Sequence, residues 1–127
     1  MANHTVTLYV DTVNVTQATV DTYCNFGQGE GTSNEDYTVT VNAGDTITWV
    51  GAALNGSTNT VSIKQINYEG NSNVFQDNNL LGSGDPKTVV GTVLSTASGL
   101  GETYKIFFNV SNKNGQFNID PKIQVNR

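Results

Sequence analysis

The sequence has very little of the chemistry on which most enzymes and metal sites depend. Its 127 residues include one cysteine, one histidine, one methionine and only six lysines and arginines together. The single cysteine, Cys24, excludes an intrachain disulfide. The net charge of −5 and the shortage of basic residues exclude the positive patch that nucleic acids and anionic membrane surfaces require. We therefore expect no nucleic-acid partner and no membrane partner.

Long apolar runs are missing as well. No segment approaches the roughly 20 apolar residues that cross a bilayer. The N-terminus, MANHTVTLYV, lacks the basic and apolar stretches of a secretion signal. If Met1 is the native start, the sequence predicts a cytoplasmic protein. The length suits a single domain, residues 1–127, with one core.

One segment suggests a copper site, but the chain has too few histidine and cysteine ligands to form it. Val41–Val50 reads VNAGDTITWV, a strand–turn–strand pattern that resembles the metal half of cupredoxins. A blue-copper site needs two histidines and a cysteine, whereas this chain offers only His4 and Cys24. A histidine-based triad and an ordinary zinc site fail for the same reason. We expect no copper and no enzymatic activity; His4 should be an exposed tail residue and Cys24 a small buried hydrophobe.

What the chain does contain indicates β structure. It has 17 Thr, 17 Asn, 15 Val and 13 Gly; Val and Thr favour strands, whereas Asn and Gly favour turns. Eight segments have strand character: Thr5–Val10, Val13–Thr22, Tyr37–Val41, Thr46–Val50, Thr60–Tyr68, Lys87–Leu94, Thr103–Ser111 and Gln116–Val125. The pattern predicts an all-β protein, a two-sheet antiparallel β-sandwich of about seven or eight strands, immunoglobulin-like or cupredoxin-like.

Local irregularities predict details of these strands. The apolar positions change parity within Thr60–Tyr68, which predicts a β-bulge near Lys64–Gln65. Asp120-Pro121 interrupts the last segment, and because proline cannot donate to a ladder we expect a bend or an edge there. Trp49 should be buried against the apolar face of Thr103–Ser111.

Two long loops, Asn25–Asp36 and Asn71–Asp85, are the candidate binding segments, since loops on a rigid scaffold often carry function. The second loop combines amides, carboxylates and an aromatic ring, which suit the hydroxyl groups and ring faces of a sugar. The expected ligand-binding residues are Asn71, Asn73, Phe75, Gln76, Asp77, Asn78 and Asn79.

Alternatives remain open for this loop. The simpler interpretation, which is favoured, is that its Asn and Asp residues only form turns and that Phe75 fills the core. Asp77 and Asp85 are weaker calcium candidates, because their oxygen atoms suit the ion but the spacing of a calcium-binding loop is absent. The rival loop Asn25–Asp36 offers similar groups: Gln28, Glu30 and Asp36.

Three segments resemble the AidA/PixA family of bacterial inclusion-body proteins: FGQGEGT at Phe26–Thr32, VNAGDTITWVG at Val41–Gly51 and YKIFFNVSNKNGQFNIDPKIQV at Tyr104–Val125. The chain departs from the family in being shorter and in having Ile119 where many members have an aromatic residue. The resemblance implies a copper-less cupredoxin-like or immunoglobulin-like β-sandwich, a bacterial origin and accumulation in the cell, sometimes as crystalline inclusions. It implies no catalytic residues.

Two functional hypotheses follow. The first, narrowly favoured, is a lectin-like module that binds carbohydrate through Asn71–Asp85. The second is a self-assembling structural protein without a small-molecule ligand, since strands with few lysines and prolines have poorly protected edges. Phe107, on the polar face of its strand, is a candidate contact in a homodimer or larger assembly.

Overall fold

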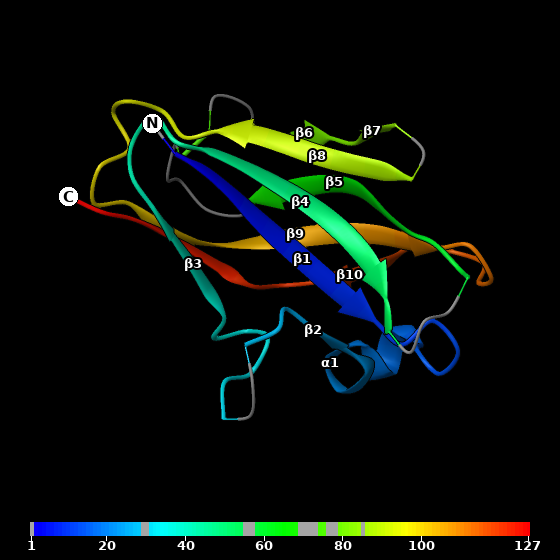
Figure 1. Cartoon of the computed structure of the whole chain (residues 1–127). Coiled ribbons are helices and arrows are strands. Elements are labelled where there is room, and N and C mark those ends of the chain that lie inside the picture. The colour runs from blue at the N-terminus through cyan, green and yellow to red at the C-terminus, as the bar shows by residue number, and fades with distance from the viewer. Residues whose placement is uncertain (1, 29–30, 55–57, 69–73, 76–78, 85) are drawn as a thin grey trace.

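The computed structural model describes residues 2–28, 31–54, 58–68, 74–75, 79–84 and 86–127. They form two β-sheets packed face to face (Figure 1). The first sheet has the strand order β2-β1-β4-β8-β7: Cys24–Asn25, Asn3–Val10, Thr46–Ala53, Lys87–Thr92 and Ser83–Gly84. The second has the order β3-β11-β9-β5-β6: Thr38–Val41, Lys122–Val125, Gly101–Val110, Val61–Tyr68 and Asn79–Leu81, with β10 (Phe117–Ile119) also paired to β9. The predicted all-β sandwich is confirmed.

The sheets are mixed, so the prediction of purely antiparallel sheets is wrong. β1 runs parallel to β4, from the pair Asn3 and Thr46 to the pair Val10 and Ala53. β3 runs parallel to β11. The reason is the turn at residues 42–45, which does not close a hairpin but carries the chain from β3 in one sheet to β4 in the other. Gly44 supplies the positive φ of 89° that this turn needs.

Side-chain alternation produces the core between the sheets. On β1, Val6, Leu8 and Val10 are each 1% exposed or less, and the alternate residues face outward. Trp49 on β4 is fully buried. Its indole N–H donates to the hydroxyl of Tyr104 on β9 at 3.1 Å, and the two rings meet edge to face with centroids 5.8 Å apart. The predicted burial of Trp49 against this strand is confirmed.

Both predicted irregularities are present. The register between β5 and β9 shifts between Ile63 and Gln65, as expected for a bulge at that point. Asp120-Pro121 separates β10 from β11, although both strands pair with β9. The backbone N–H of Tyr104 donates to the carbonyl of Pro121 at 3.0 Å, so the ladder continues across the interruption.

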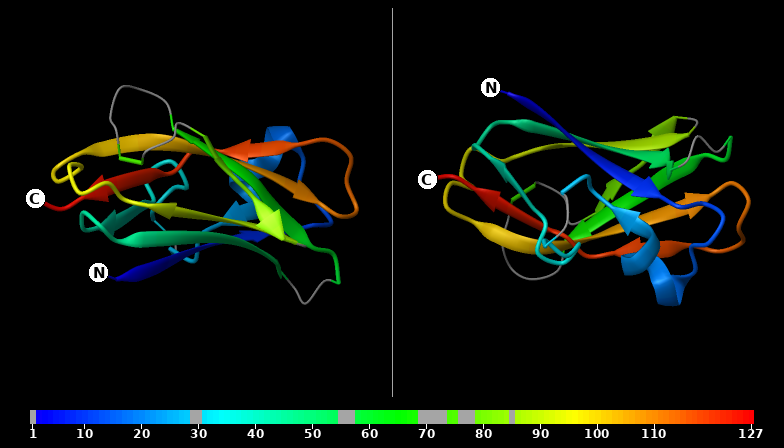
Figure 2. Two further views of the ribbon diagram at one scale, coloured as in Figure 1. Left: turned by 90° about the horizontal axis from the view of Figure 1, so that it is seen from above. Right: turned by 60° about the horizontal axis from the view of Figure 1, so that its bottom comes forward.

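The predicted strand at Val13–Thr22 is absent. This segment forms a turn, a 3-10 helix at Gln17–Thr19 and the short helix α1 at Val20–Tyr23. The Asp11 carboxylate accepts the backbone N–H groups of Val13 and Asn14 at 3.1 and 3.2 Å, which competes with strand pairing. In the left view of Figure 2 the layer of β9 and β11 lies above that of β1 and β4, and α1 is at the end of the sandwich opposite the two termini.

Candidate functional site

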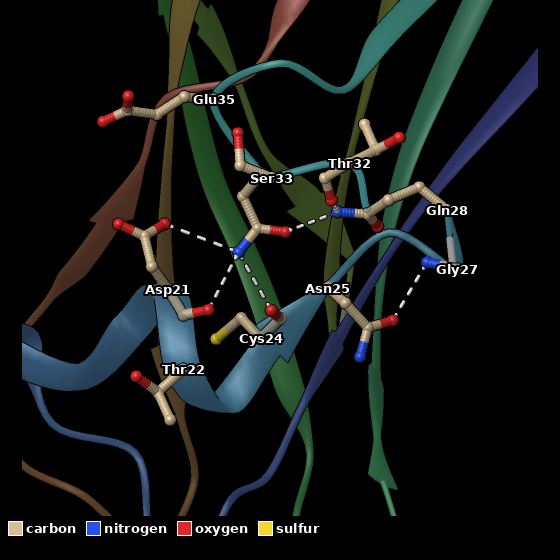
Figure 3. A pocket seen from close by; sticks show the side chains of 10 residues that line it. Asp21, Thr22, Cys24, Asn25, Gly27, Gln28, Thr32, Ser33 and Glu35 are labelled. Atoms are coloured by element: carbon tan, nitrogen blue, oxygen red, sulfur yellow. Dashed lines mark hydrogen bonds between the residues drawn. The ribbon is translucent and has the colours of Figure 1, made fainter. Parts of the chain in front are cut away.

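A depression of about 880 Å³ lies where α1 and β2 meet the loop that precedes β3 (Figure 3). Most of the residues that line it belong to the loop Asn25–Asp36. Polar groups surround it, among them those of Asp21, Thr22, Gln28, Ser33 and Glu35. Phe26, between the lining residues Asn25 and Gly27, offers no floor for a sugar, because it is buried and stacks on Tyr37 with ring centroids 4.7 Å apart.

Asn34 organises this loop, which the sequence analysis did not anticipate. Its side chain is buried, and its amide nitrogen donates to the Cys24 carbonyl at 2.9 Å. Its amide oxygen accepts from Gln28 at 2.9 Å (Figure 3). Gln28 also donates to the Thr32 carbonyl at 3.2 Å and accepts the backbone N–H of Phe26 at 2.7 Å. The two amides therefore hold the loop together, and the exposed residues at the opening include Thr22, Thr32 and Glu35.

Cys24 lies in the floor of the depression and is buried, as expected. Desolvation, with a smaller contribution from the Asp21 carboxylate, raises the pKa of its thiol to about 12. Since the thiolate is the reactive form, this cysteine is inert at neutral pH.

The predicted binding loop can be compared with the structure only in part. Phe75 is 2% exposed, and its ring packs edge to face on Trp49 with centroids 5.8 Å apart. The ring is therefore a core residue, and no face of it is left on which a sugar could stack. Asn79 begins β6 and pairs with Asn67 of β5. The other predicted ligand and calcium residues lie outside the described residues: Asn71, Asn73, Gln76, Asp77, Asn78 and Asp85.

The candidate residues of the other loop, Asn25–Asp36, are also described only in part. Gln28 holds the loop, Asp36 lies 3.3 Å from the Lys122 ammonium, and Glu30 lies outside the described residues. The binding role of either loop stays a prediction.

The two residues that resemble copper ligands lie far apart. His4 is level with Ile47 near the start of β1, whereas Cys24 pairs with Val10 at its end. Within the described part of the chain, no group of three or more His, Cys, Asp or Glu side chains is placed to hold a metal ion. The described helices include none that is long and apolar enough to span a bilayer.

His4 is not the exposed tail residue that the sequence suggested. Its ring nitrogen Nε2 lies 2.8 Å from a carboxylate oxygen of Asp45, which is buried. Asp45 also accepts the backbone N–H groups of Ala2 and Asn42, each at 2.9 Å. These two N–H groups, with a further contribution from His4, lower the pKa of Asp45 to about 2. Asp45, in the turn at residues 42–45, thus fastens the start of β1 to the connection between the two sheets.

The chain is a β-sandwich, and two of its described buried polar residues, Asn34 and Asp45, fasten a loop and a strand end. A solved structure of an inclusion body protein, PixA from Burkholderia cenocepacia J2315, has the same fold. The two superpose with a TM-score of 0.64 at 12% sequence identity, over 98% of this chain and 96% of the other. No protein-family model matches the sequence, and no curated protein matches it either. The resemblance to the AidA/PixA family is confirmed at the level of the fold.

Proposed function

We propose that this chain is a self-assembling structural protein that accumulates in inclusions, rather than a lectin or an enzyme. The observation that supports this most directly is the near end-to-end structural match with a protein that is itself an inclusion body protein. Assembly needs surfaces that recognise further copies. The buried side chains of Asn34 and Asp45 hold a loop and a strand end in place, so that these surfaces keep a fixed shape.

The edges of the sheets support the same function. β3 and β6 end one sheet, and β3 carries neither lysine nor proline, the residues that commonly protect an edge. β2 covers only Tyr9 and Val10 of β1, so no described strand pairs with the rest of that side of β1. Among the described residues, Leu81 and Val90 are large apolar side chains that are 73% and 60% exposed. Open backbone edges and exposed apolar side chains both favour association with other copies.

The first experiment is sedimentation velocity over a concentration series up to the high micromolar range. We expect at least a dimer, with an interface on the order of 1,200–2,000 Å². Phe107→Asp tests the outer face of β9, where Phe107 is half-buried between Gln65 and Asn118 on the neighbouring strands. A parent protein that remains monomeric throughout the series contradicts the proposed function.

Carbohydrate binding is the second candidate, and the depression beside α1 is the observation that favours it. Hydroxyl, amide and carboxylate groups surround an opening large enough for a sugar ring. On a glycan array, Thr22→Ala and Glu35→Ala should each weaken binding tenfold or more while the melting temperature stays constant, because both side chains are exposed. Asp77→Ala is the matched variant for the other loop. An array on which the parent binds no glycan removes this candidate.

A further inference from the structure

The edge strand β3 has a short set of backbone groups that face away from its own sheet. On its paired side, the N–H of Lys122 donates to the Tyr37 carbonyl at 2.9 Å and the N–H of Asn126 donates to the Val41 carbonyl at 2.8 Å. In a parallel pair, alternate residues of one strand bond to the other. The Tyr37 carbonyl and the backbone groups of Val39 and Val41 therefore face β11, and those of Thr38 and Thr40 face outward. Both threonines are exposed, and β3 lies at the side of the sandwich (Figure 1).

Hydrogen bonds within the molecule limit this outward edge at both ends. Before it, the backbone N–H of Asp36 donates to the Ser33 carbonyl at 3.1 Å, and the Asp36 carbonyl accepts the Thr38 hydroxyl at 3.1 Å. After it, the backbone N–H of Asn42 donates to the Asp45 carboxylate at 2.9 Å, and the Asn42 carbonyl accepts the N–H of Asp45 at 3.1 Å. The groups that remain for pairing are the N–H and C=O of Thr38 and Thr40.

These groups are complementary to a second copy of themselves. If two β3 strands lie antiparallel about a two-fold axis at Val39, Thr38 of each copy faces Thr40 of the other. All four N–H and C=O groups of each edge then have partners. Registers centred on Thr38 or on Thr40 require the backbone of Asp36 or of Asn42, whose groups are already used.

The side chains suit the same register. It places Asp36 of one copy opposite Asn42 of the other, so that a carboxylate faces an amide. The Asn42 side-chain oxygen already accepts from Asn126 at 3.0 Å, which leaves its NH₂ group to donate. Thr38 and Thr40 form cross-strand threonine pairs, a favourable combination.

We propose that two copies of this chain pair through β3 in this register and thereby join two six-stranded sheets into one continuous sheet. The inference rests on the proposed function and names one of its contacts. The other strands at the ends of the described sheets, β2, β6 and β7, have two or three residues each, against four in β3. A β3 pair is only roughly 13 Å long, at about 3.3 Å per residue. We therefore expect weak pairing that depends on protein concentration and is reinforced by further contacts in an array.

The variant that tests this pairing is Thr40→Pro. Proline removes the outward N–H and places its ring on the edge, where the folded monomer makes no use of that N–H. We expect the association constant, measured by sedimentation equilibrium, to fall tenfold or more while the circular dichroism spectrum is retained. Thr40→Val keeps the N–H and should associate like the parent. Thr5→Pro makes the same change on the open side of β1 and should also associate normally.

Amide hydrogen exchange in the parent gives an independent answer even if the proline variant does not fold. The Thr38 and Thr40 amides should exchange at least tenfold more slowly at high protein concentration than at low. The amides of Val39 and Val41, which face β11 in every state, should not change. If the parent associates but these threonine amides are unaffected and Thr40→Pro associates normally, the β3 pairing is wrong and self-assembly stands. If the parent does not associate at all, both proposals are wrong.

Discussion

Replacing Trp49 with alanine should lower the free energy of unfolding by about 3–5 kcal/mol, the range typical of removing a large aromatic residue from a core. Trp49 is fully buried, and the rings of Phe75 and Tyr104 meet it edge to face, each with its centroid 5.8 Å away. These rings come from the second sheet and from the segment between β5 and β6, so the cavity would open between the two layers. Urea unfolding followed by circular dichroism measures the change.

Tyr104→Phe is the matched control for this experiment. It preserves the edge-to-face ring contact but removes the hydroxyl that accepts the Trp49 indole N–H at 3.1 Å. A buried donor without a partner costs about 1–3 kcal/mol, so this variant should lose less stability than Trp49→Ala. The parent's tryptophan fluorescence should have an emission maximum at short wavelength. An emission maximum at the wavelength of indole in water, or equal losses in the two variants, would contradict the packing of this core.

Features that depend on neighbouring residues could be predicted from the sequence. The alternation on β1 and β9 identified the buried faces, because side chains on a strand point to opposite faces in turn. The change of parity before Ile66 indicated the bulge, and Pro121 indicated the interrupted ladder, since each breaks a local rule. These signals were sufficient for the sandwich and for the position of Trp49.

Features that depend on distant pairing could not be predicted in this way. The parallel alignment of β1 with β4 joins residues 43 positions apart, and no local pattern distinguishes it from an antiparallel pair. The turn at Gly44 looks like a hairpin in the sequence because the same residues serve either connection. At Val13–Thr22, the apolar alternation favoured a strand, but capping by Asp11 and by the reciprocal pair Thr16 and Thr19 outweighed it.

The hydrogen bonds of the candidate site could not be predicted from the sequence either. Asn34 and Gln28 were visible as polar residues of a loop, but only the fold shows that they bond to each other and to the Cys24 carbonyl. A polar loop residue that satisfies its own backbone cannot be distinguished, in sequence, from one that awaits a ligand. The sequence allowed Phe75 to be either a ligand-binding residue or a core residue, and its burial against Trp49 shows that it is a core residue.

Asp45→Asn should weaken the fold at neutral pH and should lose that effect in acid. The aspartate carboxylate accepts the N–H groups of Ala2 and Asn42 and lies 2.8 Å from the His4 ring, whereas the asparagine side chain offers a single oxygen and a donor in place of the second. The folded-state pKa of Asp45, about 2, is below its ordinary value of 3.8. Ionised Asp45 therefore stabilises the folded state fully above about pH 4, and this stabilisation is lost as pH falls from 4 towards 2.

The measurement is the difference in free energy of unfolding between the parent and Asp45→Asn across pH 2–7, from urea titrations. The difference should shrink progressively as pH falls below 4, because a protonated Asp45 resembles asparagine. Asp36→Asn is the control: its carboxylate is 71% exposed and pairs with Lys122 at the surface, where an ion pair contributes little. The same comparison in a His4→Gln background separates the contribution of the two backbone N–H groups from that of the imidazole. A difference that stays constant down to pH 2 would show that Asp45 does not hold the start of β1 through its charge. β1 would then be held by its ladders with β4 and β2 and by its buried side chains.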